Sequence, residues 1–272
     1  MRDTEIDVTP FLKWAGGKRW LLSRLADIIP KTFNRYIEPF LGSAAAYFYL
    51  SPKQALLSDI NSDLINCYVA IRDDWKRIQQ LLDEHQKNHG TRYYYKIREK
   101  NFRGTFQRAA KFLYLNRTCW NGLYRVNLDG RFNVPIGTKD SVILETDDFK
   151  TTAKLLKSVE INCCDFEQTI DYAQSGDFVF VDPPYTVKHN HNGFIKYNER
   201  LFSWNDQIRL SEAVRRASMR GAKVLVTNAN HRSVQELYSD FPRLTSVTRK
   251  SVLAADPNYR AKVQELLIQS WR

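Results

Sequence analysis

The sequence contains few of the residues on which disulfide-stabilised and membrane-spanning proteins depend. Only four of its 272 residues are cysteines, Cys67, Cys119, Cys163 and Cys164, and they lack Cys-x-x-Cys spacing. Because no signal peptide points to an oxidising compartment, we expect four reduced thiols. No uninterrupted apolar stretch approaches the roughly 20 residues of a membrane span, so we expect a soluble protein.

Histidine is also scarce, and the five histidines form no evident metal site. His85 and His89 have helical i, i+4 spacing, and His189 lies two residues before His191. Neither pair has a further ligand nearby in the sequence, and the segment around His189 is typical of a polar loop. We therefore expect no bound metal ion.

Positive charge, by contrast, is in excess. Lys and Arg number 41 against 30 Asp and Glu, which gives a formal net charge of +11. Such a charge favours a polyanionic partner, although it also fits a ribosomal protein or one at a membrane surface. With 43% hydrophobic residues, the chain can build a real core, either as one large α/β domain or as a domain with an insertion.

The most informative segment is residues 176–185, where an apolar strand leads into Asp182-Pro183-Pro184-Tyr185. An ionised Asp182 accepts hydrogen bonds and donates none, and neither proline has an N–H. Proline also restricts the preceding residue to extended geometry, which holds Asp182 at the strand's carboxyl end, where open α/β sheets bind ligands. This end suits an amino group, and the ring of Tyr185 suits stacking with a planar base. The alternative is an ordinary turn after a strand.

Residues 35–59 predict a βαβ unit. A short strand at 36–38 is followed by a turn containing Gly42, a helix rich in alanine and aromatic residues, and a strand that ends at Asp59. Asp59 lies where such folds commonly bind ribose hydroxyls, but the Gly-x-Gly-x-x-Gly phosphate-binding sequence is missing. The expected ligand is an adenosine that carries an amino acid instead of phosphates.

Residues 60–158 predict a helical, basic insertion. Between Thr91 and Arg117, aromatic residues alternate with eight basic ones: Arg92, Lys96, Arg98, Lys100, Arg103, Arg108, Lys111 and Arg117. This density predicts a phosphate-facing surface, while a solvated helix face with inward aromatic residues would give the same alternation. Residues 117–137 alternate around Asp129-Gly130, which predicts a β-hairpin able to enter a major groove.

After the insertion, alternating strands and helices resume. Ser203 is expected to cap a helix that ends by Gly221. Strands are expected at 159–163, 178–181, 223–227, 244–248 and 263–270, the last two as an antiparallel pair. The predicted fold class is therefore α/β, with one sheet domain interrupted by the helical insertion.

Five blocks, in this order, resemble the Dam-like adenine-specific DNA methyltransferases, and the resemblance covers nearly the whole chain. The blocks are Phe11-Leu12-Lys13-Trp14-Ala15-Gly16-Gly17-Lys18, Glu38-Pro39-Phe40-Leu41-Gly42-Ser43, Ser58-Asp59-Ile60-Asn61-Ser62-Asp63-Leu64, Asn121-Gly122-Leu123-Tyr124-Arg125 and Asp182-Pro183-Pro184-Tyr185. The resemblance implies a Rossmann-like methyltransferase sheet, with S-adenosylmethionine as methyl donor and the N6 amine of adenine in duplex DNA as acceptor. Residues 1–59 and 159–272 would then form the S-adenosylmethionine-binding catalytic domain, and 60–158 an inserted target-recognition domain that carries the β-hairpin.

The resemblance also assigns roles by position. The catalytic residues would be Asp182, Pro183, Pro184 and Tyr185. The cofactor would be bound by Trp14, Ala15, Gly16, Gly17, Lys18, Glu38, Pro39, Phe40, Gly42, Ser43, Asp59, Ile60, Asp165, Phe166 and Asp182. Double-stranded DNA would be contacted by Lys13, Trp120, Asn121, Leu123, Arg125, Asn133 and Pro135. Because the residues that match Lys13, Asn121, Leu123, Arg125 and Pro135 lie at or near the bases in relatives that modify GATC, GATC is the expected site.

The expected chemistry requires no metal and no covalent nucleophile. The adenine amine is a weak nucleophile because its lone pair is delocalised, and acceptors such as Asp182 and the Pro183 carbonyl improve it by holding its hydrogens. The target base must be flipped out of the duplex, where it can stack on Tyr185. The loop 186–200 is expected either to order over that base or to be an ordinary surface loop.

Two other functions remain open at this stage. An RNA or protein amine methyltransferase could use the same strand end, and a non-enzymatic DNA-binding protein could retain the cofactor fold as a sensor. The hairpin favours duplex DNA, and the intact motif at 182–185 favours an enzyme. We expect a cytoplasmic protein, bacterial and nucleoid-associated or encoded by a phage, that acts in DNA modification or restriction-modification. Its oligomeric state is open, with a monomer favoured.

Overall fold

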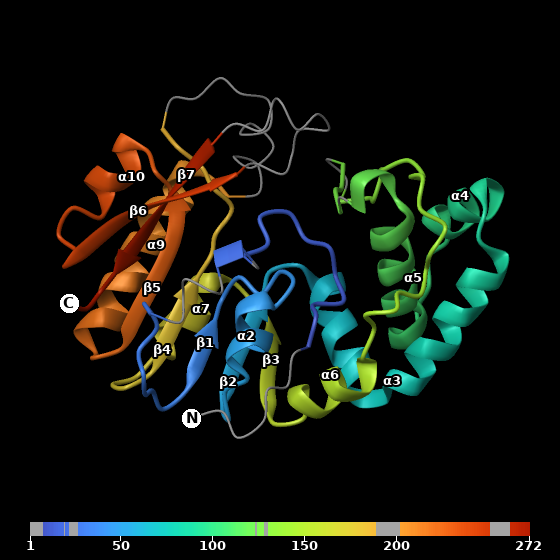
Figure 1. Cartoon of the computed structure of the whole chain (residues 1–272), viewed down its shortest axis with the longest axis horizontal. Coiled ribbons are helices and arrows are strands. Elements are labelled where there is room, and N and C mark those ends of the chain that lie inside the picture. The colour runs from blue at the N-terminus through green and yellow to red at the C-terminus, as the bar shows by residue number, and fades with distance from the viewer. Residues whose placement is uncertain are drawn as a thin grey trace. The chain divides into compact units, whose positions relative to one another are not determined.

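The computed structural model describes residues 8–18, 20–21, 27–122, 124–127, 130–188, 202–250 and 262–272 (Figure 1). Contacts divide the chain into two compact units. The first unit comprises residues 1–22, 41–53 and 59–163, and the second comprises residues 23–40, 54–58 and 164–272. The functional division into a catalytic domain and a recognition domain stays a prediction.

A seven-stranded mixed sheet has the order β3-β2-β1-β4-β5-β7-β6. Its strands are β1 (Tyr36–Glu38), β2 (Ala55–Asp59), β3 (Val159–Cys163), β4 (Phe178–Val181), β5 (Lys223–Ala229), β6 (Arg243–Lys250) and β7 (Lys262–Gln269). β1 pairs in parallel with β2 and β4, β4 pairs in parallel with β5, and β7 is antiparallel to β5 and β6. The order reverses between β1 and β4, which is the switch point where doubly wound sheets bind ligands. The predicted α/β class and Rossmann-like sheet are confirmed.

The first unit is mainly helical. Its helices are α2 (Ala45–Leu50), α3 (Ser62–Asn88), α4 (Thr91–Glu99), α5 (Thr105–Thr118) and α6 (Phe149–Leu156), with a short 3₁₀ helix, η1 (Trp120–Gly122). Asn61 begins α3, because its side-chain oxygen accepts hydrogen bonds from the backbone N–H groups of Asp63 and Leu64, both at 3.1 Å. The helical stretch predicted after Asp59 is thus three consecutive helices.

The last turn of α5 contains a buried arginine. Arg117 donates hydrogen bonds from its two terminal nitrogens to the Asp147 carboxylate at 2.6 and 2.7 Å, and also to the carbonyls of Val142 and Phe11. The side chains of Arg117 and Asp147 are only 3% and 4% exposed. The prediction that Arg117 faces phosphates is therefore wrong, because this guanidinium joins three segments inside the unit.

Two more of the predicted phosphate-facing residues have partners within the first unit. Lys111 donates from Nζ to the carbonyls of Arg98 and Lys100, at 2.9 and 2.6 Å, and so satisfies acceptors at the end of α4. Arg108 pairs with Asp63 at 2.7 Å. The basic stretch therefore combines structural contacts with exposed side chains, and phosphate binding by the exposed ones stays a prediction.

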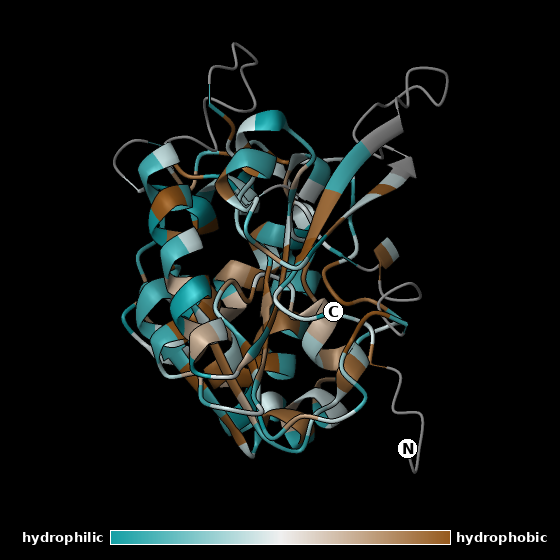
Figure 2. Cartoon of the chain, turned by 90° about the vertical axis from the view of Figure 1, so that its left-hand side faces the viewer, coloured by the Kyte–Doolittle hydropathy of each residue, from teal (hydrophilic) through white to brown (hydrophobic). Residues whose placement is uncertain are grey.

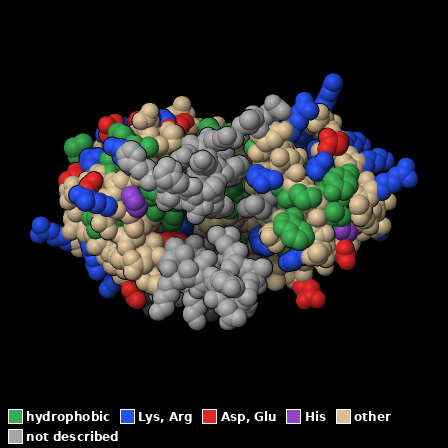
Figure 3. Space-filling view, turned by 90° about the horizontal axis from the view of Figure 1, so that it is seen from above, with side chains coloured by type: hydrophobic (Ala, Val, Ile, Leu, Met, Phe, Trp, Pro, Cys, Tyr) green, Lys and Arg blue, Asp and Glu red, His purple; other side chains and the backbone are tan. Residues whose placement is uncertain are grey.

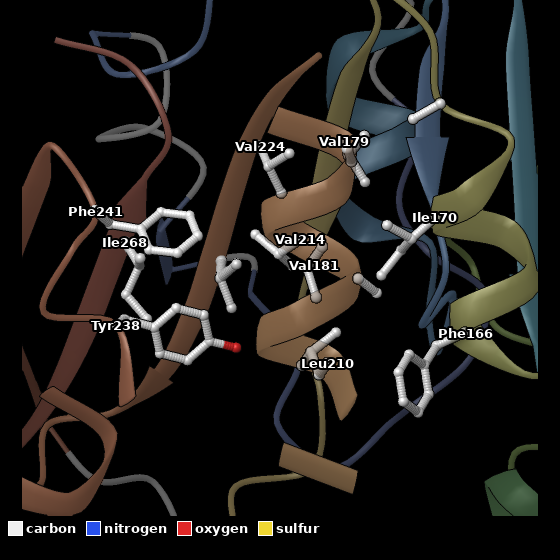
Figure 4. Packing of buried hydrophobic residues seen from close by; sticks show 14 of the residues in the cluster. Phe166, Ile170, Val179, Val181, Leu210, Val214, Val224, Tyr238, Phe241 and Ile268 are labelled. Atoms are coloured by element: carbon white, nitrogen blue, oxygen red, sulfur yellow. The ribbon is translucent and has the colours of Figure 1, made fainter. Parts of the chain in front are cut away.

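The second unit packs α7 (Phe166–Asp171), α9 (Trp204–Met219) and α10 (Arg232–Leu237) with strands around one hydrophobic cluster. Figure 4 shows Leu210 and Val214 of α9 near Val181 of β4. All four residues of β4 are buried, which explains its uninterrupted apolar sequence. The helices carry hydrophilic as well as hydrophobic residues, as amphipathic elements do (Figure 2).

The predicted boundaries of α9 are confirmed. Ser203 accepts a hydrogen bond from the Asp206 backbone N–H, and the Asp206 carboxylate accepts one from the Ser203 N–H, which together form a capping box. Gly221 follows the helix with φ +90°, a conformation that favours glycine.

All four cysteines are free thiols, as predicted. None of the helices in the described part of the chain combines the length and the apolar character that a membrane span requires.

Candidate functional site

In the second unit, β4 ends at the predicted acceptor motif. Val181 of β4 lies beside Val226 of β5 in parallel register, so Asp182 and Thr227 are neighbours at the carboxyl ends of the two strands. The Thr227 hydroxyl donates a hydrogen bond to Asp182 Oδ1 at 2.6 Å. Asp182 is half-buried and Pro183 is buried. The carboxylate is therefore held by a donor from β5 as well as by the proline that follows it.

Tyr185 is fixed through its hydroxyl. This group donates a hydrogen bond at 2.7 Å to Oε2 of Glu265 on β7, whose side chain is 1% exposed. Burial, followed by the negative charges of Asp182 and Glu265, raises the pKa of Tyr185 well above its usual value, while a hydrogen bond with Thr227 acts in the opposite direction. Tyr185 is therefore a neutral donor at physiological pH.

A second carboxylate, that of Glu38, ends β1, the other strand at the switch point. Glu38 is 3% exposed, and its Oε2 accepts a hydrogen bond from the Tyr36 hydroxyl at 2.9 Å. Two residues later, Phe40 stacks on Phe166, with ring centroids 5.3 Å apart and an interplanar angle of 21°. Because β1 pairs directly with β4, the two strands at the switch point each end at a carboxylate.

Asp165 has a structural role that the sequence did not indicate. Its Oδ1 accepts a hydrogen bond from the Glu167 backbone N–H, which caps α7, and another from Arg209 at 2.9 Å. The Arg209 guanidinium also lies 4.9 Å from the centroid of the Phe166 ring. Asp165 and Phe166 thus belong to an ion-pair and aromatic cluster, and their contact with a cofactor stays a prediction.

In the first unit, the predicted cofactor turn at Gly42 packs directly against Trp14. A Cβ added to Gly42 would lie 2.8 Å from Trp14 Cδ1, and the φ of +47° also favours glycine. The Gly42 N–H donates to Asp59 Oδ2 at 3.2 Å, and its carbonyl accepts from the Tyr68 hydroxyl at 2.9 Å. The turn is therefore held from both sides, with its backbone close to an indole ring.

Asp59 ends β2 as predicted. Its Oδ1 accepts a hydrogen bond from the Asn61 N–H at 3.0 Å. Burial raises the pKa of Asp59, and hydrogen bonds from the backbone of Asn61, Gly42 and Ile60 partly offset this rise. Ile60, the next residue, exposes 72% of its side chain.

The remaining residues of the first predicted block form a turn. Ala15, Gly16 and Gly17 are exposed, and the Gly17 N–H donates to the Trp14 carbonyl at 3.3 Å. Lys18 is buried, and its Nζ donates to the Gly16 carbonyl at 2.9 Å. Lys18 thus forms a hydrogen bond back to the turn that precedes it.

Most of the predicted DNA-contacting residues lie on one exposed surface of the first unit. Leu123 lies outside the described residues, and the others are all exposed: Lys13, Trp120, Asn121, Arg125, Asn133 and Pro135. Hydrogen bonds join Trp120 N to Pro135 O at 2.9 Å and Arg125 Nε to Asn133 Oδ1 at 3.4 Å. Asn116, at the end of α5, binds both the N–H and the carbonyl of Lys13. These bonds join Trp120 to Pro135 and Arg125 to Asn133, and they fix the backbone of Lys13. We call the six exposed residues, after the contact predicted for them, the base-contact surface.

In its described residues, the predicted hairpin has antiparallel pairing but no extended strands. Isolated bridges join Cys119 with Ile136 and Val126 with Phe132. Residues 128–129, at the predicted turn, lie outside the described residues. So do residues 189–200, which make up most of the predicted loop 186–200.

A stack of aromatic rings links the cofactor turn to the hairpin. Trp14 stacks on Tyr124, with centroids 5.7 Å apart and an interplanar angle of 19°, and Tyr124 packs on Phe112 at 4.7 Å. Asn121, just before Tyr124, has φ +57°, a left-handed conformation that asparagine tolerates. The indole that packs on Gly42 therefore also supports the base-contact surface.

The sequence model of the D12 class N6 adenine-specific DNA methyltransferases matches residues 14–252. The chain belongs to this family. It is 34% identical over 280 residues to the type II methyltransferase M1.LlaDCHI of Lactococcus lactis subsp. cremoris, covering 100% of this chain and 98% of the relative. It is 37% identical over 292 residues to the type II methyltransferase M.MjaIII of Methanocaldococcus jannaschii, covering 98% and 100%. The DNA adenine methylase of Haemophilus influenzae is 31% identical over 267 residues, covering 95% and 92%.

The predicted family and enzyme class are thus confirmed: the protein is an adenine-specific DNA methyltransferase. In this methyltransferase, the predicted motif Asp182–Tyr185 lies at the switch point of the sheet, as expected. Two residues that contact the motif, Thr227 and Glu265, were missed, because only the pairing of β5 with β4 and β7 brings them there. For Thr227, the sequence signal that could have indicated it is a polar residue near the end of an apolar run. Glu265 lies in the middle of β7 and has no such signal.

Proposed function

We propose that this methyltransferase transfers a methyl group from S-adenosylmethionine to the N6 amine of a flipped adenine in duplex DNA, within GATC. The observation that carries the proposal is the Asp182 carboxylate, held by Thr227 at the switch point of the sheet. Asp182 and the Pro183 carbonyl would accept the hydrogens of the amine as its nitrogen pyramidalises. The carboxylate would also stabilise the positive charge that grows on this nitrogen during the transfer.

The residues of the candidate cofactor site fit S-adenosylmethionine. When bound, this cofactor supplies a methyl group on a positively charged sulfur. Asp59, whose two oxygens accept backbone hydrogen bonds, is fixed in place, and a carboxylate has capacity for ribose hydroxyls beyond those bonds. Gly42 brings backbone close to Trp14 where a side chain would not fit. The missing phosphate-binding glycine pattern agrees with a ligand that has no phosphate.

The complete set of proposed cofactor-binding residues is unchanged from the sequence prediction. Glu38, a buried carboxylate oriented by Tyr36, suits the ammonium group or a hydroxyl of the cofactor. Lys18 and the turn before it lie in the same first-unit segment as Trp14, so we propose that this segment binds the cofactor as a whole. Asp165 and Phe166 would contribute from the cluster on α7.

We propose that the base-contact surface reads the target sequence. Its arginine and asparagine side chains match the base edges of a GATC site, since arginine binds guanine in a bidentate manner and asparagine binds adenine. Exposed Lys and Arg side chains also project from the part of the first unit that carries α4 and α5, on the right in Figure 3. These cations would bind DNA phosphates without reading sequence.

Base flipping follows from the chemistry, because a paired adenine hides its amine in the duplex. Extrusion costs a few kcal/mol, and stacking on the half-buried Tyr185 ring would recover about 1–3 kcal/mol. The Tyr185 hydroxyl is bound to Glu265, so this contact fixes the position of the ring at its far end.

The deciding experiment maps N6-methyladenine across the genome of a methylation-deficient host that expresses the wild-type chain or Asp182→Ala. We expect methylated adenine in GATC with the wild type and none with the variant. Methylation in another sequence would overturn the GATC assignment and leave the chemistry intact. A folded, expressed wild-type protein that modifies no adenine would overturn the proposed function.

A further inference from the structure

Two side chains outside the acceptor motif hold its functional groups. Thr227 on β5 donates a hydrogen bond to Asp182 Oδ1 at 2.6 Å, and Glu265 on β7 accepts one from the Tyr185 hydroxyl at 2.7 Å. Thr227 is 0% exposed and Glu265 is 1% exposed, so neither geometry depends on a mobile surface side chain. The motif is thus supported from the two strands that follow β4 in the sheet order.

Thr227 can fix the direction of the Asp182 carboxylate. Its β-branched side chain is stiff about χ1, and its backbone position is set by the pairing of β5 with β4 on one side and β7 on the other. The terminal torsion of an aspartate, in contrast, is broad. A hydrogen bond from a rigid hydroxyl to one carboxylate oxygen therefore selects the plane of the carboxylate.

Glu265 can fix the tilt of the Tyr185 ring. It lies opposite Ala229 of β5 and Val247 of β6, in the middle of the sheet's antiparallel end. Pro183 and Pro184 have fixed φ angles, so the chain that leads from Asp182 to Tyr185 is stiff. Anchoring the hydroxyl at the far end of the ring restricts the side-chain torsions that remain.

We propose that Thr227 and Glu265 are positioning residues of the methyltransferase. Thr227 turns the Asp182 carboxylate toward the amine of the target base, and Glu265 holds the Tyr185 ring in the stacking position. This inference rests on the proposed function of the Asp182–Tyr185 motif. It predicts that Thr227 acts mainly on methyl transfer, through the Asp182 acceptor, and Glu265 mainly on stacking of the flipped base. Thr227 also hydrogen-bonds Tyr185, and we expect this contact to have the smaller effect.

The test for Thr227 compares Thr227→Val, which keeps the shape and removes the hydroxyl, with Thr227→Ser, which keeps the hydroxyl. We expect Thr227→Val to lower kcat about 10- to 100-fold, with KM for duplex DNA and for S-adenosylmethionine nearly unchanged, because a misdirected catalytic group costs rate at this scale. Thr227→Ser should retain most of kcat. If Thr227→Val does not fold, Thr227→Ala carries the same expectation.

The pH profile provides a readout that a purely structural role would not move. A hydroxyl donor favours the ionised carboxylate, so Thr227→Val should shift the acid limb of the kcat profile to higher pH, and Thr227→Ser should not. The other titratable groups in the network are Tyr185 and Glu265. Glu265→Gln removes a negative charge from this network, so it should shift the limb to lower pH, in the direction opposite to Thr227→Val. Wild-type kcat and an unmoved limb in folded Thr227→Val would overturn the inference for Thr227.

The test for Glu265 uses 2-aminopurine at the target position, since its fluorescence rises when the base leaves the stack. Glu265→Leu and Tyr185→Phe should each reduce this signal and raise KM for DNA, whereas Glu265→Gln, which can still accept from the hydroxyl, should resemble the wild type. The double variant Tyr185→Phe/Glu265→Leu should be no worse than the poorer single variant, because both remove one interaction. Additive losses, or a signal unchanged in Glu265→Leu, would overturn the inference for Glu265.

These outcomes separate the inference from the proposed function. A wild-type enzyme that methylates no adenine defeats the proposed function whatever the variants do. An active wild type, an inactive Asp182→Ala and a normal Thr227→Val defeat only the positioning role of Thr227.

Discussion

The acceptor motif in the second unit and the base-contact surface in the first unit are built in opposite ways. Asp182 and Tyr185 follow a buried strand, and two further strands supply their hydrogen-bond partners. The base-contact residues are exposed and lie on irregular chain around two isolated antiparallel bridges. The positions of the motif residues are fixed by the geometry of the sheet. The positions of the base-contact side chains are constrained by few neighbours.

This difference indicates how one fold can keep a reaction while the target sequence varies. Substitutions in the acceptor motif disturb buried partners and should affect chemistry. Substitutions on the base-contact surface remove exposed atoms, which usually changes stability little. Under the roles proposed above, target recognition would change without loss of the fold, provided that the interior beneath the surface stays intact.

The prediction with the largest expected effect concerns the buried interior of the first unit. Arg117→Ala should lower the free energy of unfolding by about 3–5 kcal/mol, because it leaves Asp147 as a buried charge without its partner. Urea denaturation measures the change. The matched control is Glu236→Ala, which breaks an exposed pair with Arg232, 62% and 87% exposed respectively, and should cost less than about 1 kcal/mol. Similar small losses in both variants would contradict the role given to Arg117.

The next effect concerns the acceptor motif. Asp182→Ala should lower methyl transfer at least about 100-fold, the scale at which one electrostatic contact to a transition state acts. The affinity for duplex DNA should change little, because the substitution removes no cation. Transfer of a labelled methyl group and fluorescence anisotropy measure the two quantities. Near-normal turnover would remove Asp182 from the mechanism.

A pH-dependent effect on stability is expected in the first unit. Burial, and then the charge of Lys100, lowers the pKa of His85 from 6.5 to about 4. Its Nδ1 shares a hydrogen bond with the Tyr93 hydroxyl. The unfolded chain binds this proton more readily than the folded protein does. The contribution of neutral His85 to the free energy of unfolding is therefore complete above the unfolded pKa of 6.5, and it is lost as pH falls toward 4. The loss should reach about 3 kcal/mol.

Urea denaturation at a series of pH values measures this loss. His85→Gln should show a shallower fall in unfolding free energy over the same pH window. Parallel curves for the wild type and the variant would show that His85 does not titrate as expected.

The smallest effect is expected on the base-contact surface. Arg125→Ala should reduce discrimination against altered target sites by about 1–3 kcal/mol without a measurable change in unfolding free energy. Arg131, another exposed arginine of the same hairpin, provides the control, and Arg131→Ala should weaken binding to all sequences alike. Competition binding with altered sites distinguishes the two patterns. Unchanged discrimination in Arg125→Ala would place recognition elsewhere.

Much of the fold was predictable from local sequence. Apolar runs such as that of β4, and the Ser203 cap of α9, are determined by residues close together in the chain. The acceptor motif was predictable for the same reason, because prolines act on their immediate neighbours.

Features that depend on distant partners were not predictable. Arg117 looked like a DNA-binding cation until Asp147, thirty positions later, was found beside it. The ion pair of Asp165 with Arg209, and the bond of Tyr185 with Glu265, join residues 44 and 80 positions apart. The backbone of Asp74, inside α3, is non-helical. The helical periodicity of the sequence continues through this position and gives no sign of the break. The periodicity of hydrophobic residues indicates on which face of a helix or strand a side chain lies. It does not identify the distant residue that this side chain contacts.

The position of β7 between β5 and β6 has a consequence for protein synthesis. The ribosome makes β7 after both of its neighbours, so a nascent chain that has emerged only through β6 lacks the strand that joins them. It also lacks Glu265. Residues 262–269 must insert before the hydrogen bond that holds Tyr185 can form, so this contact forms only when the sheet is complete.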